Sequence, residues 1–135
     1  AVRRIAEAEP FVADDLGAYV AAMVDFHQQD PALVRLLLAE SADRRGRLAR
    51  AKQRREHYAE RVDAVRGAQR EGTVRDDVDA RVVVYAVLAL VVTAQALPEL
   101  TELILGADRR RRPLDQRRFR AELRRLVDAL VEPSP

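Results

Sequence analysis

The sequence predicts an all-α domain built as a bundle of five to six helices, and three observations support this prediction. Apolar residues recur at spacings of three and four along most of the chain, which is the period of an amphipathic helix. Five glycines and six prolines among 135 residues leave long stretches of helix-forming residues uninterrupted. No segment convincingly alternates apolar and polar residues as a strand does. We expect one domain over residues 1–135, with 1–9 as a lead-in and 132–135 as a tail.

The first two helices are expected at about 10–29 and about 31–45. Between them, Asp30 is a suitable N-cap, and Pro31 fits the first turn of a helix. The first helix has one apolar stripe, which consists of Val12, Leu16, Tyr19, Met23 and Phe26. The second helix carries the apolar residues Leu33, Leu36, Leu37 and Leu38.

The third helix is expected at about 48–71, with Gly72 as its C-terminal cap. It is long and mostly polar, and its apolar stripe consists of Leu48, Ala51, Tyr58, Val62 and Val65. The fourth helix is expected at about 77–97, with Asp76 or Asp77 as its N-cap.

The last part of the chain begins at Pro98, which is expected to break the fourth helix and leave a short continuation ending at Gly106. A final helix follows at about 114–131. Apolar residues repeat along it at spacings of four, three and four, and they are Phe119, Leu123, Leu126 and Leu130.

The fourth helix is the most informative element, because no residue from Val82 to Val92 is charged. A helix that is apolar all round must be covered all round, and a second copy of the chain is the expected cover on its outer side. The alternative is burial at the centre of a monomer. One stripe holds mostly small residues: Val82, Ala86, Ala89, Thr93 and Ala96. A bulkier stripe holds Val83, Val87, Leu90, Ala94 and Leu97. The pattern does not decide which stripe faces the partner, but we assign the small one, with the stripe of the final helix, to a four-helix bundle between two chains.

Several classes of chemistry lack their motifs in this sequence. The chain has no cysteine, and it has no nucleophile elbow, zinc-protease motif, phosphate loop or dinucleotide-binding glycine pattern. Two histidines that are 30 positions apart do not make a metal site. We therefore expect no enzyme activity, no cofactor and no metal. The apolar run at 82–97 is short for a membrane span, and no signal peptide is evident, so a cytoplasmic protein that makes no membrane contact is expected.

A small-molecule site is predicted from polar groups on otherwise apolar helix faces. His27 continues an apolar stripe, so it is either a core histidine bonded to a backbone carbonyl or a polar anchor for a ligand. Arg55 and Glu40 are expected to form an ion pair that joins two helices or to anchor a ligand. His57 is expected to be solvated. The remaining candidates for the cavity wall are Tyr19, Met23, Tyr58, Val62, Tyr85 and Leu88.

Two arginine-rich stretches keep a nucleic-acid-binding alternative open. Seven basic residues and no acidic one lie between Arg44 and Arg55, and nine basic residues lie between Arg109 and Arg125. Either stretch could contact phosphates, but neither contains interleaved aromatic residues or a helix-turn-helix. Solvated helix faces are the simpler interpretation.

Two segments resemble a known family. The segment from His27 to Glu40 is similar to the pattern "P.L.RLLL.E" of the ligand-binding domains of TetR-family transcriptional regulators. The segment from Gly72 to Asp79 is similar to their "G.LR.D.D" turn, which precedes a long apolar helix. The order of the helices also fits, and the resemblance covers about residues 10–131.

The resemblance implies the effector-binding and dimerisation domain of a regulator, expected to be a repressor. In that family the last two long helices, here 77–97 and 114–131, form a four-helix bundle in a homodimer. The effector cavity lies among the helices at 10–29, 31–45 and 48–71 and the core-facing side of the fourth. Operator DNA would be bound only through a helix-turn-helix domain that this chain lacks. A structural dimerisation module without a ligand is the alternative.

Overall fold

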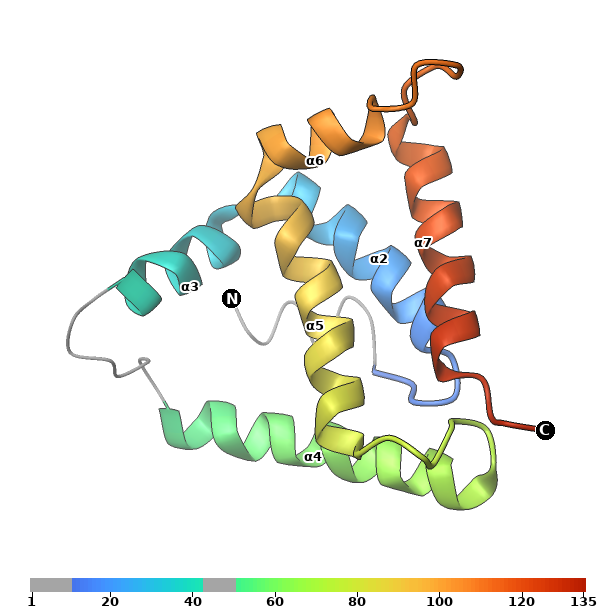
Figure 1. Cartoon of the computed structure of the whole chain (residues 1–135). Helices are drawn as coiled ribbons and strands as arrows, with labels where there is room; N and C mark the ends of the chain where they lie inside the picture. Colours follow the sequence, from blue (N-terminus) through green and yellow to red (C-terminus); the bar gives the residue numbers. More distant parts are fainter. Residues whose placement is uncertain (1–10, 43–50) are drawn as a thin grey trace.

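The computed structural model describes residues 11–42 and 51–135, which form six α-helices and no strand (Figure 1). The all-α prediction is therefore confirmed for these residues. The helices are α2 (Leu16–Gln29), α3 (Ala32–Ala42), α4 (Ala51–Glu71), α5 (Ala80–Ala96), α6 (Pro98–Leu105) and α7 (Gln116–Val131). The predicted start of the third helix at Leu48 and the arginines at 44–50 lie outside the described residues.

Three helices begin at an aspartate whose carboxylate accepts a hydrogen bond from a backbone N–H of the first turn. Asp15 caps α2, Asp79 caps α5 and Asp115 caps α7. The prediction of Asp76 or Asp77 as the cap of the fourth helix is wrong by two to three residues. Asp77 is instead paired with a neighbouring arginine, and the chain turns once more before the helix begins.

The helix ends follow the predicted signals. Gly72 follows α4 with a φ of +79°, a conformation that glycine adopts without steric cost. Pro98 occupies the first turn of α6, and the axes of α5 and α6 are bent by 97° at this break. No single helix within 11–42 and 51–135 is long and apolar enough to cross a membrane; α5 and α6 satisfy that test only as a bent pair.

The core forms where α2 packs on both α7 and α5, and α4 packs on the first half of α5 (Figure 1). The fully buried side chains include Val20 and Val24 of α2, Val65 of α4, Val91 of α5 and Val127 of α7. α2 and α4, by contrast, make little close backbone contact. The first half of α4, residues 51–62, contributes no fully buried side chain among those described.

The apolar stripe of α7 is only partly covered by the protomer. Leu123 is buried with Val127 in the core of the protomer, and Phe119 is half-buried against it. Leu126 and Leu130 belong to the same broad apolar face of the helix and are about half exposed. Leu123 was expected at the dimer interface, but within the protomer its side chain is buried in the core that α7 forms with α2.

Candidate functional site

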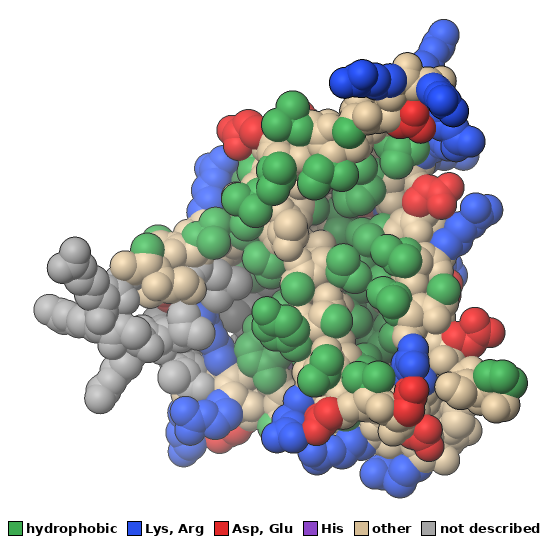
Figure 2. Space-filling view, in the orientation of Figure 1, with side chains coloured by type: hydrophobic (Ala, Val, Ile, Leu, Met, Phe, Trp, Pro, Cys, Tyr) green, Lys and Arg blue, Asp and Glu red, His purple; other side chains and the backbone are tan. Residues whose placement is uncertain are grey.

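An exposed apolar surface covers one side of the molecule. We call it the outer face and define it by Val82, Tyr85, Ala86, Ala89 and Thr93 of α5 with Leu126 and Leu130 of α7. Figure 2 shows hydrophobic side chains gathered over α5, α6 and the adjoining side of α7. The side chains of Leu103 and Ile104 extend the apolar area onto α6. A surface of this extent on a small domain is typical of a protein–protein contact.

The two stripes of α5 are separated by the structure. The bulkier stripe faces inward, since Val83 and Val87 are buried and Leu90 is half-buried. In the small-residue stripe Val82, Ala86 and Thr93 are exposed, whereas Ala89 and Ala96 are half-buried. The small residues therefore lie on the side of α5 that the protomer leaves uncovered.

The sequence suggested that Tyr85 lines an internal cavity, but the structure places it elsewhere. Its side chain is 73% exposed on the outer face. Successive helical residues are rotated by about 100°, so Tyr85 lies on the opposite side of α5 from both Val83 and Val87. Leu88, the other candidate on α5, is half-buried.

The expected pairing of Arg55 with Glu40 is also wrong. Arg55 is exposed, and its neighbour Arg54 makes the contact: Arg54 Nη1 lies 2.8 Å from Glu40 Oε2. Both side chains of this pair are about 15% exposed. An ion pair does join α3 to α4, as predicted, but the arginine that forms it is one position earlier than expected.

A polar cluster joins α2 to α4 at Arg61. Its Nη1 donates to the hydroxyl of Tyr19 over 2.7 Å, and its Nε donates to Nε2 of His57 over 2.9 Å. The guanidinium carbon lies 4.8 Å from the ring centre of Phe11 and 5.2 Å from that of Tyr19, within the range of cation–π attraction. Sequence reasoning missed Arg61, although its spacing of three from Tyr58 was a usable signal.

The electrostatics of this cluster follow from burial beside a cation. Burial raises the pKa of Tyr19, and this effect outweighs the opposing attraction of Arg61. The pKa of His57 is lowered by burial and then by the Arg61 charge. His57 was expected to be solvated, and this is wrong: it is half-buried and accepts the Arg61 hydrogen bond as a neutral imidazole.

The buried wall of α2 contains the other predicted ligand-binding residues. Tyr19, Met23 and His27 are buried, and on α4 Tyr58 and Val62 are half-buried. His27 is 5% exposed, and its Nδ1 has no hydrogen-bond partner among the residues that the structure describes. The bond to a backbone carbonyl expected of a core histidine is therefore not formed at that atom. Burial lowers the pKa of His27, so the neutral form is favoured.

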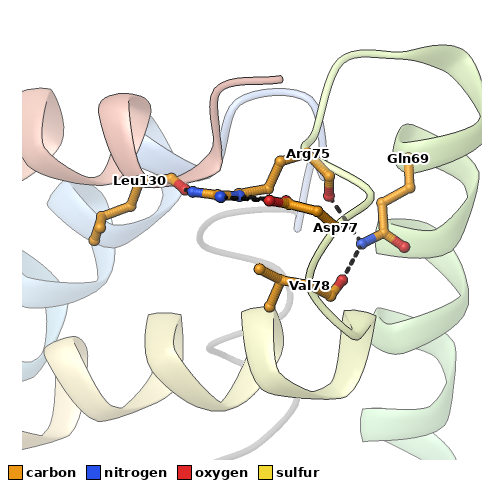
Figure 3. Close-up of polar contacts among 5 residues, drawn as sticks. All are labelled: Gln69, Arg75, Asp77, Val78 and Leu130. Atoms are coloured by element: carbon orange, nitrogen blue, oxygen red, sulfur yellow. Dashed lines mark hydrogen bonds and ion pairs between the residues drawn. The ribbon is translucent and has the colours of Figure 1, made fainter. Parts of the chain in front are cut away.

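The turn between α4 and α5, residues 72–79, contains the second pattern singled out in the sequence. Arg75 forms a two-pronged ion pair with Asp77, at 2.6 and 2.7 Å (Figure 3). Its Nη1 also donates to the carbonyl of Leu130, and its backbone N–H donates to the carbonyl of Val131 over 2.8 Å. Arg75 thereby holds the C-terminal end of α7, and its hydrogen bonds lower the pKa of Asp77.

The same turn is fixed to α4 by Gln69. The Gln69 amide donates to the carbonyls of Arg75 and Val78, over 3.0 and 2.8 Å (Figure 3). The carboxylate of Asp79 accepts a hydrogen bond from the backbone N–H of Arg81 and so caps the N-terminus of α5. The end of α4, the start of α5 and the end of α7 are consequently joined at one turn.

Other features of the described residues carry no evident chemistry. An open depression of about 250 Å³ lies beside this turn and is lined by Arg66, Gln69, Arg70 and Asp76, none of which is a predicted ligand-binding residue. Within 11–42 and 51–135, no group of three or more histidine and carboxylate side chains is arranged to hold a metal ion. The arginines at 109–112 are exposed.

Comparison with known proteins relates this architecture to transcriptional regulators. Residues 15–132 match the family model of the tetracyclin repressor-like C-terminal domain. Over 98 residues the chain is 30% identical to the HTH-type transcriptional repressor SCO4008 of Streptomyces coelicolor. That match covers 72% of this chain and 51% of the repressor, so the chain spans about half the length of this relative.

Proposed function

Because this chain belongs to the tetracyclin repressor-like C-terminal domain family, we propose that it is the dimerisation and effector-binding part of a transcriptional repressor. The observation that carries the proposal is the outer face. A protomer that buries one side of α5 and leaves the small-residue side open requires a cover of matching shape.

A second copy of the chain suits this surface. Small residues such as Ala86 and Ala89 allow the backbones of two α5 helices to approach closely, while Leu126 and Leu130 supply bulk beside them. Two copies of α5 and two of α7 would then form a four-helix bundle around a two-fold axis. Tyr85 lies within this bundle in the proposal, where its ring is covered by the partner.

The oligomeric state under dilution tests the dimer. Leu126→Glu would place a charge in the bundle, so we expect sedimentation to show a monomer at concentrations where the unmodified chain is a dimer. Leu36→Glu on α3 is the matched control, because both leucines are 50% exposed in the protomer. An unmodified chain that sediments as a monomer at micromolar concentration, or two variants that behave alike, would refute the proposal.

The effector site is proposed between α2, α3, the first half of α4 and the core-facing side of α5. Tyr19, Met23, His27, Tyr58 and Val62 supply an apolar wall with a few polar groups, which is the usual composition of a small-molecule site. Nδ1 of His27 supports this location: it has no hydrogen-bond partner among the described residues, a buried polar atom without a partner is costly, and a ligand could satisfy it.

Regulation would follow from a shift between helix arrangements. An effector that binds one arrangement of α4 better than another shifts the population toward it. The turn at 72–79 joins α4 to both helices of the proposed bundle, so this shift would alter the spacing of DNA-binding heads attached to the two protomers. Operator binding by such heads belongs to the proposal for the whole regulator.

Ligand-dependent stability tests the effector site. We expect at least one member of a panel of apolar and aromatic compounds to raise the melting temperature of the chain, because a ligand that binds only the folded state stabilises it. Met23→Arg should abolish that increase. If no compound raises the melting temperature, α2 has no such site.

A further inference from the structure

Arg61 is a half-buried cation whose described neighbours are neutral. Its two hydrogen bonds go to the hydroxyl of Tyr19 and to the imidazole of His57, and aromatic rings lie against the guanidinium. Within residues 11–42 and 51–135, no carboxylate lies within 4.0 Å of it. Arg54, about two turns earlier on the same helix, has the carboxylate of Glu40 instead.

The guanidinium has unused donors that face no protein acceptor of the described residues. Arginine has five N–H groups, and Tyr19 and His57 take one each, which leaves three on the terminal nitrogens. A partly buried cation is stabilised by an anion that accepts such donors in pairs, and a carboxylate matches the guanidinium fork. The hydrogen bonds to Tyr19 and His57 hold the fork in place before any ligand arrives.

Arg61 lies where the described parts of α2 and α4 make few close backbone contacts. Among the described residues, the hydrogen bond from Arg61 to Tyr19 joins α4 to α2, whereas the buried side chains of α4, Val65 and Ala68, lie further along the helix. Tyr58 and Val62, both half-buried, flank Arg61 on α4. A ligand beside Arg61 would therefore meet a fixed cation at one end and apolar surface around it.

We propose that the effector of this domain is an organic anion, with a carboxylate bound by Arg61 and an apolar body lying between α2 and α4. This inference depends on the proposed effector site and adds its ligand class. Tyr19 and His57 are positioning residues, because they orient the guanidinium. The predicted anchor Arg55 has no part in it, since its side chain points to solvent.

Matched acids and amides test the charge requirement. The probes are 4-phenylbutanoate, decanoate and indole-3-acetate, each compared with its uncharged primary amide by calorimetry. We expect at least one acid to bind about tenfold or more tightly than its amide, as a charge-assisted hydrogen bond in a partly buried site would give. Arg61→Gln should abolish that preference, and Arg61→Lys should reduce it by removing the fork while retaining the charge.

The control is Arg66→Gln, an identical substitution on α4 at a side chain that is 51% exposed. It should leave the preference for acids unchanged, and circular dichroism should show that each variant is folded. If acids and amides bind equally well, or if Arg61→Gln retains the preference, the charge assignment is wrong while the effector site stands. If no probe binds, the inference and the effector site both fail.

Discussion

Gly17 of α2 lies directly against Asp128 of α7. A Cβ atom built at Gly17 would collide with the carboxylate of Asp128 and would stand 2.8 Å from the backbone carbonyl of Arg124. The absence of a side chain at this one position lets α2 and α7 pack closely, next to the buried side chains of Leu16 and Val127.

Gly17→Ala should destabilise the fold, although alanine is the better helix former. The Asp128 side chain can move, but the Arg124 carbonyl is backbone, so α7 must shift at a cost of about 1–3 kcal/mol in the free energy of unfolding. Gly67→Ala on α4 is the control, because its new Cβ would meet nothing closer than 3.8 Å. Urea denaturation should show Gly67→Ala stabilising by up to about 1 kcal/mol, and equal effects would contradict the packing argument.

Arg54→Ala should be more harmful than Arg55→Ala. Loss of Arg54 leaves the half-buried carboxylate of Glu40 without its partner, which costs about 1–3 kcal/mol of unfolding free energy. Arg55 is exposed, so its replacement should change the free energy by less than about 0.5 kcal/mol. Thermal and chemical denaturation of the two variants distinguish the neighbouring positions. A larger loss for Arg55→Ala would show that the α3–α4 pair is assigned to the wrong arginine.

Stability should fall as the pH drops below about 6.5. His27 and His57 are the two histidines of the chain, and burial lowers both of their pKa values in the folded state. The unfolded state then binds protons more readily from about pH 6.5 downward, so the folded state loses stability until the pH passes below the folded pKa. Melting temperatures measured between pH 8 and pH 5 should follow this slope in the unmodified chain, because the range includes the ordinary histidine pKa of about 6.5.

The slope should diminish in His27→Gln and again in the variant with both histidines replaced by glutamine. Glutamine retains hydrogen-bonding capacity but does not titrate. A slope that is unaltered in the double variant would assign the pH dependence to other groups.

The contribution of Asp79 to stability as the N-cap of α5 should be separable from the contribution of its negative charge. Its carboxylate accepts from the backbone N–H of Arg81 and also pairs with the Arg81 side chain, and these hydrogen bonds hold its pKa well below the usual range. Asp79→Asn retains a side-chain oxygen for the cap, so its melting temperature at pH 7 should exceed that of Asp79→Ala. The low folded pKa stabilises the unmodified chain above about pH 4 and is lost at more acidic pH. Neither variant should show this loss, and identical melting temperatures for the two would argue against the cap.

The helices could be predicted from sequence because their signals are local. The stripe from Leu16 to Met23, the cap at Gly72 and the break at Pro98 depend on residues that are close in sequence. The start of α5 was placed too early because three aspartates at 76, 77 and 79 are all good caps. Asp77 pairs instead with Arg75, and Arg75 also contacts Leu130 at the end of α7, 55 positions away, which no local pattern shows.

The candidate sites were less predictable, because helical periodicity gives a face but not its neighbour. It could not assign Tyr85 to the open side of α5, because that helix is apolar all round, nor could it tell which part of the apolar face of α7 the protomer covers at Leu123. Nor could it distinguish Arg54 from Arg55 opposite Glu40. Arg61 was missed because its partner Tyr19 is 42 positions away in the sequence.

The two ends of α4 are attached unequally to the rest of the protomer. Its C-terminal end is hydrogen-bonded through Gln69 to the turn that holds α5 and α7. Near its N-terminal end, the described attachment is the ion pair of Arg54 with Glu40. Arg54 and Gln69 are 15 positions apart, which is about 22 Å along the helix. A tilt of α4 by about 5° about Gln69 would therefore move the Arg54 end by about 2 Å. A ligand in the proposed effector site, close to the Arg54 end, would therefore need to tilt α4 only slightly to displace that end by this distance.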